Sequence, residues 1–249
     1  MLLLESMAEL IIGIPRIEEA VGKLGEELGE LLSSYSSIAL PLSKGLCRDL
    51  IYKGVGAVDE DLMDISLKYF NASLARIWWP VIKEIPRLAI EMPHKEVACY
   101  EEDVDPRSLE TNAYRLATLL IRARISISGR IDPRPWIEFF KPAKKIFPKI
   151  PNVRVIVADG YVKYREILDL VEHKNARKLW KLIPTPLEIL EMIAKGYLDE
   201  EYSVDAVRFS IRYLGDYVIG SKDLTDAYEK LLRDREYVDF LASIGVLED

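Results

Sequence analysis

Apolar residues at spacings of three and four dominate this chain, and this spacing limits the possible folds more than any other feature of the sequence. Segment 17–35 is typical, because Val21, Leu24 and Leu28 recur with the period of an α-helix. Similar patterns predict helices over 43–52, 59–88, 107–126, 136–146, 161–180, 187–195, 205–218 and 224–233. The best strand candidate is the short apolar run 153–157. We therefore predict a mainly α-helical fold with a minor β element.

Capping signals indicate where one domain ends and the next begins. Residues 185–188 (TPLE) form a capping box that opens a helix, and Gly196 is placed to end it. We predict a helical N-terminal domain over 1–183, with a small basic α/β element near 136–183. A small helical C-terminal domain is expected over 184–249.

Two clusters of residues in the predicted N-terminal helices bear on packing. Gly22, Gly25 and Gly29 recur along one helix and permit close approach of a neighbouring segment. The Trp78-Trp79 pair precedes Pro80, which should stop or kink its helix. These rings serve either the core or a ligand platform, and the core is the more frequent role.

Composition restricts the class of protein and its compartment. The 249 residues are 49% apolar, so they can bury a sizeable core, and no apolar run is long enough to span a membrane. The start of the chain lacks a basic leader, so no signal peptide is expected. Cys47 and Cys99 are far apart, which favours a reducing, cytoplasmic compartment over a disulfide scaffold. The chain has no Gln and is 30% charged, which is typical of proteins from thermophiles, including archaea.

The sequence contains few of the patterns that carry catalysis. It has no Walker loop, no GxGxxG after a strand, no HExxH and no GxSxG, and it has only two histidines. The pair Asp103 and Asp105 could hold Mg²⁺ for nucleotidyl transfer. Asp105 is equally explained as the cap of the helix that follows.

A basic strip stands out from a chain whose net charge is −7. Residues 121–183 hold fifteen Lys and Arg against six Asp and Glu. Such a surface either binds phosphates or an acidic partner, or it is a solvated helix face. The candidate nucleic-acid-binding cations are Lys141, Lys144, Lys145, Lys149 and Arg154. The rings of Trp136, Phe139, Phe140 and Phe147 lie between them, either to stack on bases or to fill the core.

Another pair of cations lies in the C-terminal domain. Arg208 and Arg212 are four residues apart, so both guanidinium groups emerge from one face of a helix. Acidic residues precede them, so the pair serves either in internal salt bridges or in a clamp for a triphosphate.

The order of several short segments resembles the DNA primase large subunit family of archaeal and eukaryotic type. The end of that family's helical domain is similar to 140–143 (FKPA), 151–155 (PNVRV), 160–162 (GYV) and 165–171 (REILDLV). Its C-terminal domain is similar to 185–190 (TPLEIL), 208–214 (RFSIRYL), 218–220 (VIG) and 222–228 (KDLTDAY). The resemblance covers about 100 residues, and the first 130 residues show only a compatible helical pattern.

The family's C-terminal domain holds an iron–sulfur cluster on four cysteines, and this chain departs from that pattern. The first of those cysteines would fall near Leu187, but no cysteine follows Cys99. No iron–sulfur cluster, metal or other cofactor is therefore expected. The chain is similar to a cluster-free relative, either the small third subunit of some crenarchaeal primases or a large subunit that has lost the cluster.

The resemblance implies a non-catalytic subunit of an archaeal DNA primase, with no catalytic residues of its own. Such a subunit would bind the catalytic subunit and hold the single-stranded DNA template and the nucleoside triphosphate that initiates the RNA primer. It implies that Arg208 and Arg212 contact the triphosphate and that Tyr213 stacks on the base. The alternative is a helical protein–protein interaction module without a nucleic-acid role, which the acidic net charge favours.

Overall fold

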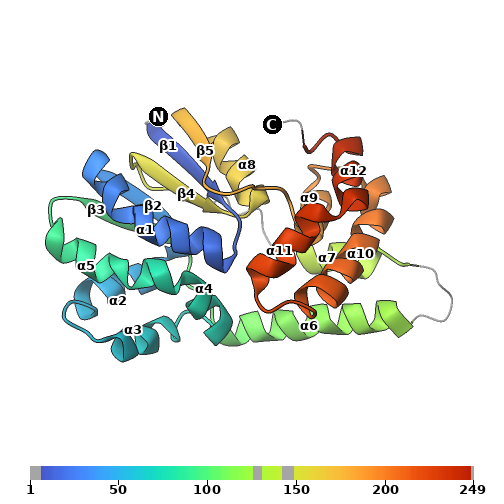
Figure 1. The fold of residues 1–249 in the computed structure, drawn as a ribbon, viewed down its shortest axis with the longest axis horizontal. Coiled ribbons are helices and arrows are strands. Elements are labelled where there is room, and N and C mark those ends of the chain that lie inside the picture. Colours follow the sequence, from blue (N-terminus) through green and yellow to red (C-terminus); the bar gives the residue numbers. More distant parts are fainter. Residues whose placement is uncertain (1–6, 126–130, 142–148, 248–249) are drawn as a thin grey trace. The chain divides into compact units, whose positions relative to one another are not determined.

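The computed structural model describes residues 7–125, 131–141 and 149–247. The chain divides into two compact units, each built from two stretches of sequence (Figure 1). The first, called here the α/β unit, comprises Met1–Glu110 and Phe147–Leu182. The second, called the helical unit, comprises Thr111–Ile146 and Ile183–Asp249.

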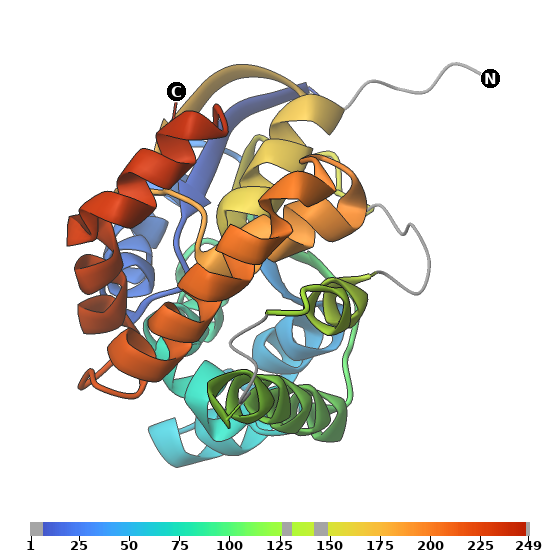
Figure 2. The same cartoon turned by 90° about the vertical axis from the view of Figure 1, so that its right-hand side faces the viewer.

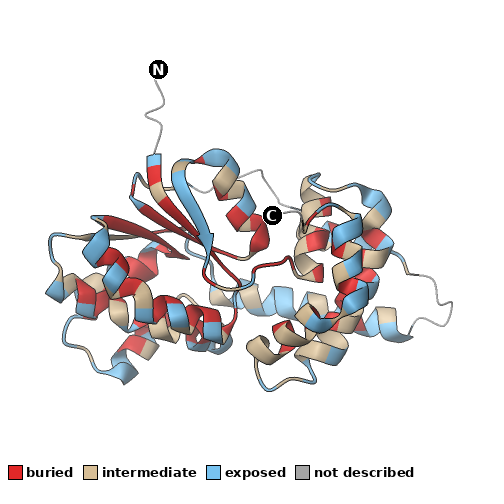
Figure 3. Ribbon diagram, turned by 45° about the horizontal axis from the view of Figure 1, so that its top comes forward, coloured by how far each residue is buried: buried red, intermediate tan, exposed pale blue. Residues whose placement is uncertain are grey.

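A parallel sheet forms the centre of the α/β unit. Its strands are β1 (Met7–Ile14), β2 (Ser37–Ser43), β3 (Glu96–Glu101), β4 (Val155–Asp159) and β5 (Glu172–Lys178). They lie in the order β3-β2-β4-β1-β5, and every neighbouring pair is parallel. β2 and β4 are buried along their whole length, whereas β5 is an exposed edge strand (Figure 3). The inner strands therefore read as continuous apolar runs, as expected where both faces of a sheet are covered.

Helices connect these strands and cover the sheet. In the α/β unit they are α1 (Glu18–Ser34), α2 (Lys44–Lys53), α3 (Asp59–Ser66), α4 (Ala72–Ile82), α5 (Glu84–Glu91) and α8 (Tyr161–Leu170). α1 packs on α4, while α8 contacts β1, β4 and β5. A Cβ atom at Gly25 would lie 2.8 Å from the backbone oxygen of Pro80, so this glycine permits the close contact of α1 with α4. Trp78 is 2% exposed, which confirms its predicted core role.

The helical unit contains most of α6 (Pro106–Ile125), whose first residues, up to Glu110, belong to the α/β unit. Its other helices are α7 (Arg134–Phe140), α9 (Pro186–Lys195), η1 (Glu200–Tyr202), α10 (Ser203–Arg212), the π-helical turn η2 (Tyr213–Val218), α11 (Leu224–Arg233) and α12 (Arg235–Ser243). α10, α11 and α12 follow one another from orange to red in Figure 2.

Aromatic side chains build the core of the helical unit. The ring of Phe209 lies 5.2 Å from that of Tyr237 and 5.1 Å from that of Phe240. The buried hydroxyl of Tyr237 donates to the backbone oxygen of Pro184, and that of Tyr228 pairs with the backbone of Ile183. These bonds fasten the start of the second stretch of the unit to its last two helices.

Local sequence signals in this unit are confirmed. The Thr185 side chain accepts from the Glu188 amide, and the Glu188 carboxylate accepts from the Thr185 amide, so the capping box is formed. Gly196 ends α9 in the left-handed conformation with φ 78°. The expected strand near 153–157 is also present, as β4.

The chain is mainly helical with a smaller β part, as predicted, but the expectation of a helical N-terminal domain is corrected. Three of the strands precede residue 102, and the end of the predicted helix 161–180 is the strand β5. β2 contains Pro41, and the pairing of β2 with β3 shifts register between Leu40 and Ser43, so this proline sits at an irregularity. The last stretch of the helical unit begins at Ile183, one residue before the expected division at 183/184, and 111–146 also belongs to that unit.

The expectation for the two cysteines is also corrected. Cys47 in α2 and Cys99 in β3 form a disulfide, with Cα atoms 6.0 Å apart. They are distant in sequence but adjacent in space, because α2 packs on β3. The separation of the two cysteines in the sequence is therefore no argument for a reducing compartment.

Within the described residues, none of the helices is both long and apolar enough to cross a membrane.

Candidate functional site

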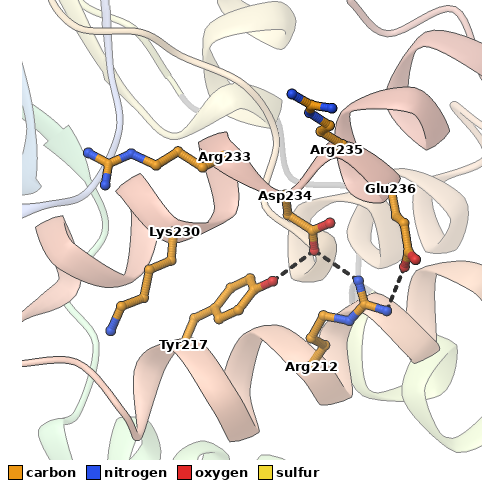
Figure 4. A pocket seen from close by; sticks show the side chains of 7 residues that line it. All are labelled: Arg212, Tyr217, Lys230, Arg233, Asp234, Arg235 and Glu236. Atoms are coloured by element: carbon orange, nitrogen blue, oxygen red, sulfur yellow. Dashed lines mark hydrogen bonds and ion pairs between the residues drawn. The ribbon is translucent and has the colours of Figure 1, made fainter.

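A pocket of about 500 Å³ lies in the helical unit, at the corner where α11 meets α12 (Figure 4). Its lining combines four cationic side chains, two carboxylates and one phenol. The residues are Arg212, Tyr217, Lys230, Arg233, Asp234, Arg235 and Glu236. The excess of cations over carboxylates makes this pocket a candidate for anion binding.

Asp234 shapes the corner. It follows the last residue of α11 and is the N-cap of α12, and its Oδ1 accepts from the Tyr237 amide at 3.3 Å. Its Oδ2 accepts from Arg212 Nη1 at 3.0 Å and from the Tyr217 hydroxyl at 2.9 Å. Both carboxylate oxygens are thus used, so Asp234 fixes the angle between the two helices and ties them to α10 and η2.

Arg212 is held inside this network by two acidic partners. Its Nη2 donates to Glu236 at 2.7 Å, in addition to the bond with Asp234. These bonds, above all the one to Glu236, raise the pKa of the Arg212 guanidinium above its already high ordinary value. Burial opposes ionisation of Asp234, but the bonds from Tyr217 and Arg212 outweigh it and lower the pKa of this carboxyl. In Figure 4 the side chains of Arg212 and Tyr217 point toward Asp234.

The other cations of the pocket differ in how far they are engaged. Lys230 contacts Asp226 at 3.1 Å and the backbone oxygen of Gly220 at 3.0 Å. Arg233 pairs with Glu229 at 2.9 Å but its side chain is 78% exposed. Among the described residues, the exposed guanidinium of Arg235 has no ion pair or hydrogen bond. Arg233 and Arg235 are therefore the groups that an incoming anion meets with the least competition.

The three residues predicted to bind a nucleotide do not come together at this pocket. Arg208 pairs with Asp205 at 2.9 Å and does not line the pocket. Arg212 lines the pocket but is engaged by carboxylates, so the salt-bridge alternative describes both arginines. Tyr213 is 7% exposed, so its ring presents no open face for stacking on a base.

The predicted nucleic-acid-binding cations do not share one compact unit. Lys141 lies in the helical unit and pairs with Glu138 at 3.1 Å. Lys149 and Arg154 lie in the α/β unit, where Arg154 pairs with Glu9 at 3.4 Å. The remaining two, Lys144 and Lys145, and the ring of Phe147 lie outside the described residues. Trp136 is 2% exposed, which agrees with a core role for that ring.

The acidic pair considered for Mg²⁺ serves the local fold. Asp103 accepts from the Gly45 amide at 2.8 Å, and Asp105 accepts from the Arg107 amide at the start of α6 at 3.0 Å. In the part of the chain that the structure describes, no three His, Cys, Asp or Glu side chains gather as metal ligands would.

The sequence interpretation missed Lys230, Arg233 and Arg235. Their signal is the run KLLRDRE, in which basic residues flank an aspartate that can both end one helix and cap the next. This short run lies in a strongly acidic region, so a count of charge over long segments does not reveal it.

No family model, no curated protein and no solved structure matches this chain.

Proposed function

We propose that the helical unit binds the phosphate groups of a nucleic acid or a nucleoside triphosphate. The observation that carries this proposal is the pocket at the α11–α12 corner, whose lining includes the exposed cations Arg233 and Arg235 on either side of Asp234 (Figure 4). Guanidinium groups bind phosphate oxygens through paired, charge-assisted hydrogen bonds. Arg212 acts here as a positioning residue, because it holds Asp234 and hence the corner that presents the two arginines.

We further propose that the protein serves as a non-catalytic subunit of an archaeal DNA primase, in the cytoplasm. The support for this assembly is the resemblance of 140–183 and 184–249 to the primase large subunit family. In this role the catalytic subunit makes the phosphodiester bonds, and the pocket holds the initiating triphosphate or the template backbone. Holding the initiating triphosphate close to the catalytic subunit lowers the entropic cost of forming the first phosphodiester bond.

Binding of ATP and of a single-stranded oligo(dT) to the full chain, measured at several salt concentrations, tests the phosphate proposal. The variant Arg233→Ala/Arg235→Ala should bind about tenfold more weakly, since two exposed charge contacts contribute roughly 0.5–1 kcal/mol each. The slope of log K against log salt for oligo(dT) should fall by about 1 for each phosphate contact removed.

The matched control is Lys23→Ala/Arg76→Ala, which removes two exposed cations from the α/β unit and should leave binding unchanged. Equal affinities of the wild type and both variants would remove the pocket from consideration. The primase assignment has its own test, which is initiation of primers by a catalytic primase subunit with and without this chain. An unchanged rate of dinucleotide synthesis together with no complex between the two proteins would refute it.

The net charge of −7 favours a second candidate, an interaction module that binds only protein. This candidate predicts that neither ATP nor oligo(dT) binds at any salt concentration. A stable complex with a partner protein in the same preparation would then be the supporting result.

A further inference from the structure

The sheet of the α/β unit has a topological switch point between β1 and β4. From β1 the chain passes through α1 to β2, toward the β3 edge of the sheet. From β4 it passes through α8 to β5, which is the opposite edge of the sheet. Right-handed crossovers in opposite directions place α1 and α8 on opposite faces of the sheet. In open parallel sheets, ligands bind at the carboxyl ends of the strands at such a point. This location is independent of the pocket in the helical unit.

A buried carboxylate occupies this point. Asp159 is the last residue of β4, pairs in register with Ile14 at the end of β1, and is 4% exposed. Its Oδ2 accepts from Arg16 Nε at 2.7 Å. Its Oδ1 is buried and accepts no hydrogen bond from the described residues. A buried acceptor without a donor is costly, so a group that supplies the donor binds favourably.

Two long side chains cover Asp159. Lys163, in the first turn of α8, has its Nζ 3.6 Å from Oδ1 but is hydrogen-bonded to Glu101 at the end of β3. The side chains of Arg16 and Lys163 are 49% and 22% exposed. A ligand of Asp159 must displace these two side chains, which are long and have several rotamers. The neighbouring Glu101 is 32% exposed and offers a second acceptor.

The charges at this point favour a neutral ligand. Arg16 is paired with Asp159 and Lys163 with Glu101, so the four groups cancel. The connection from β1 to α1 is Pro15-Arg16-Ile17, which lacks the glycines that bring a backbone close to a phosphate, and α1 begins with two glutamates. Binding of an anion is therefore not favoured here. Binding of a cation is not favoured either, because Arg16 and Lys163 already pair with the two carboxylates.

We propose that the switch point binds a neutral sugar with vicinal hydroxyls, either a free pentose or the ribose of a nucleoside. One hydroxyl donates to Asp159 Oδ1, and the adjacent hydroxyl donates to Glu101. Lys163, released from these carboxylates, donates to a sugar oxygen. A carboxylate that accepts from a ribose hydroxyl at a strand end is a known form of sugar recognition in parallel sheets.

Ribose, 2-deoxyribose and adenosine are the probes, and the amide spectrum of the ¹⁵N-labelled full chain is the readout. Ribose should shift the amide signals of Gly160 and Lys163, and 2-deoxyribose should bind about tenfold more weakly because one donor is missing. Adenosine binding more tightly than ribose identifies a nucleoside site, and equal affinities identify a free-sugar site. Asp159→Asn should abolish the shifts, whereas the matched change Asp169→Asn at the exposed far end of α8 should preserve them.

Absence of binding by both ribose and adenosine would overturn the proposal, as would equal binding of ribose and 2-deoxyribose. If Asp159→Asn does not fold, a crystal of the wild-type protein soaked in ribose decides instead. Sugar density within hydrogen-bond distance of Asp159 Oδ1 supports the proposal, and a water molecule alone on that oxygen refutes it.

Discussion

The disulfide between Cys47 and Cys99 should be a major source of stability for the α/β unit. The two cysteines are separated by 52 positions, so the bond closes a long loop in the unfolded chain. The chain-entropy relation for a loop of this length gives about 14 cal/mol/K, or about 4 kcal/mol of unfolding free energy at 25 °C. This is a large share of the unfolding free energy of a whole domain, which is roughly 5–15 kcal/mol.

Urea unfolding with and without reductant measures this contribution. In a Trp136→Phe background the remaining tryptophans, Trp78, Trp79 and Trp180, all belong to the α/β unit and report on its unfolding. With a slope of about 2 kcal/mol/M, loss of 4 kcal/mol should lower the urea midpoint by about 2 M. The reduced protein is compared with the oxidised protein at equal concentration.

The variant that replaces both Cys47 and Cys99 by Ala is the control, and reductant should not change its midpoint. The two cysteines are only 4% and 8% exposed, so their alkylation should require unfolding of the protein. Because they are joined in a disulfide, it should also require a reductant. A midpoint shift below about 0.5 M on reduction would contradict the entropic argument. Two alkylated cysteines in denatured protein that was never reduced would show that the bond is not formed.

Two further predictions concern packing and pH. Gly25→Ala should lower the unfolding free energy by about 1–3 kcal/mol, because its Cβ would meet the Pro80 backbone at 2.8 Å. Gly22→Ala, on the same helix but with nothing within 4 Å of the new Cβ, should raise it by about 0.5–1 kcal/mol, and an equal effect of both changes in urea unfolding would contradict this reasoning. The folded-state pKa of Asp234 is lowered, so its stabilisation is present above about pH 4 and is lost as the pH falls through the folded-state pKa. Asp234→Asn should therefore weaken the acid sensitivity of the helical unit, and an unchanged pH profile of the unfolding free energy would refute this role.

The candidate pocket was predictable only in part. Arg212 was identified because two arginines four residues apart share one face of a helix. That spacing says nothing about Asp234 and Glu236, which lie more than twenty residues further along and neutralise this guanidinium. Arg235 gains its importance from the corner between α11 and α12, which is a property of packing.

The sequence by itself determined the positions of several helices, among them α1, α2, α6, α9 and α11, through interactions that span only a few residues, whereas the single helix expected over 59–88 is three helices and α12 was not predicted. The capping box at Thr185, the left-handed Gly196 and the apolar stripe of α1 all depend on groups within one or two helical turns. Only the tertiary structure decided the sheet. β5 has a polar, charged sequence and is a strand because β1 offers it an edge, and Asp159 meets Arg16 across 143 positions of sequence. Pairing of this kind depends on which distant segments come together, and that choice is made by the burial of the whole core.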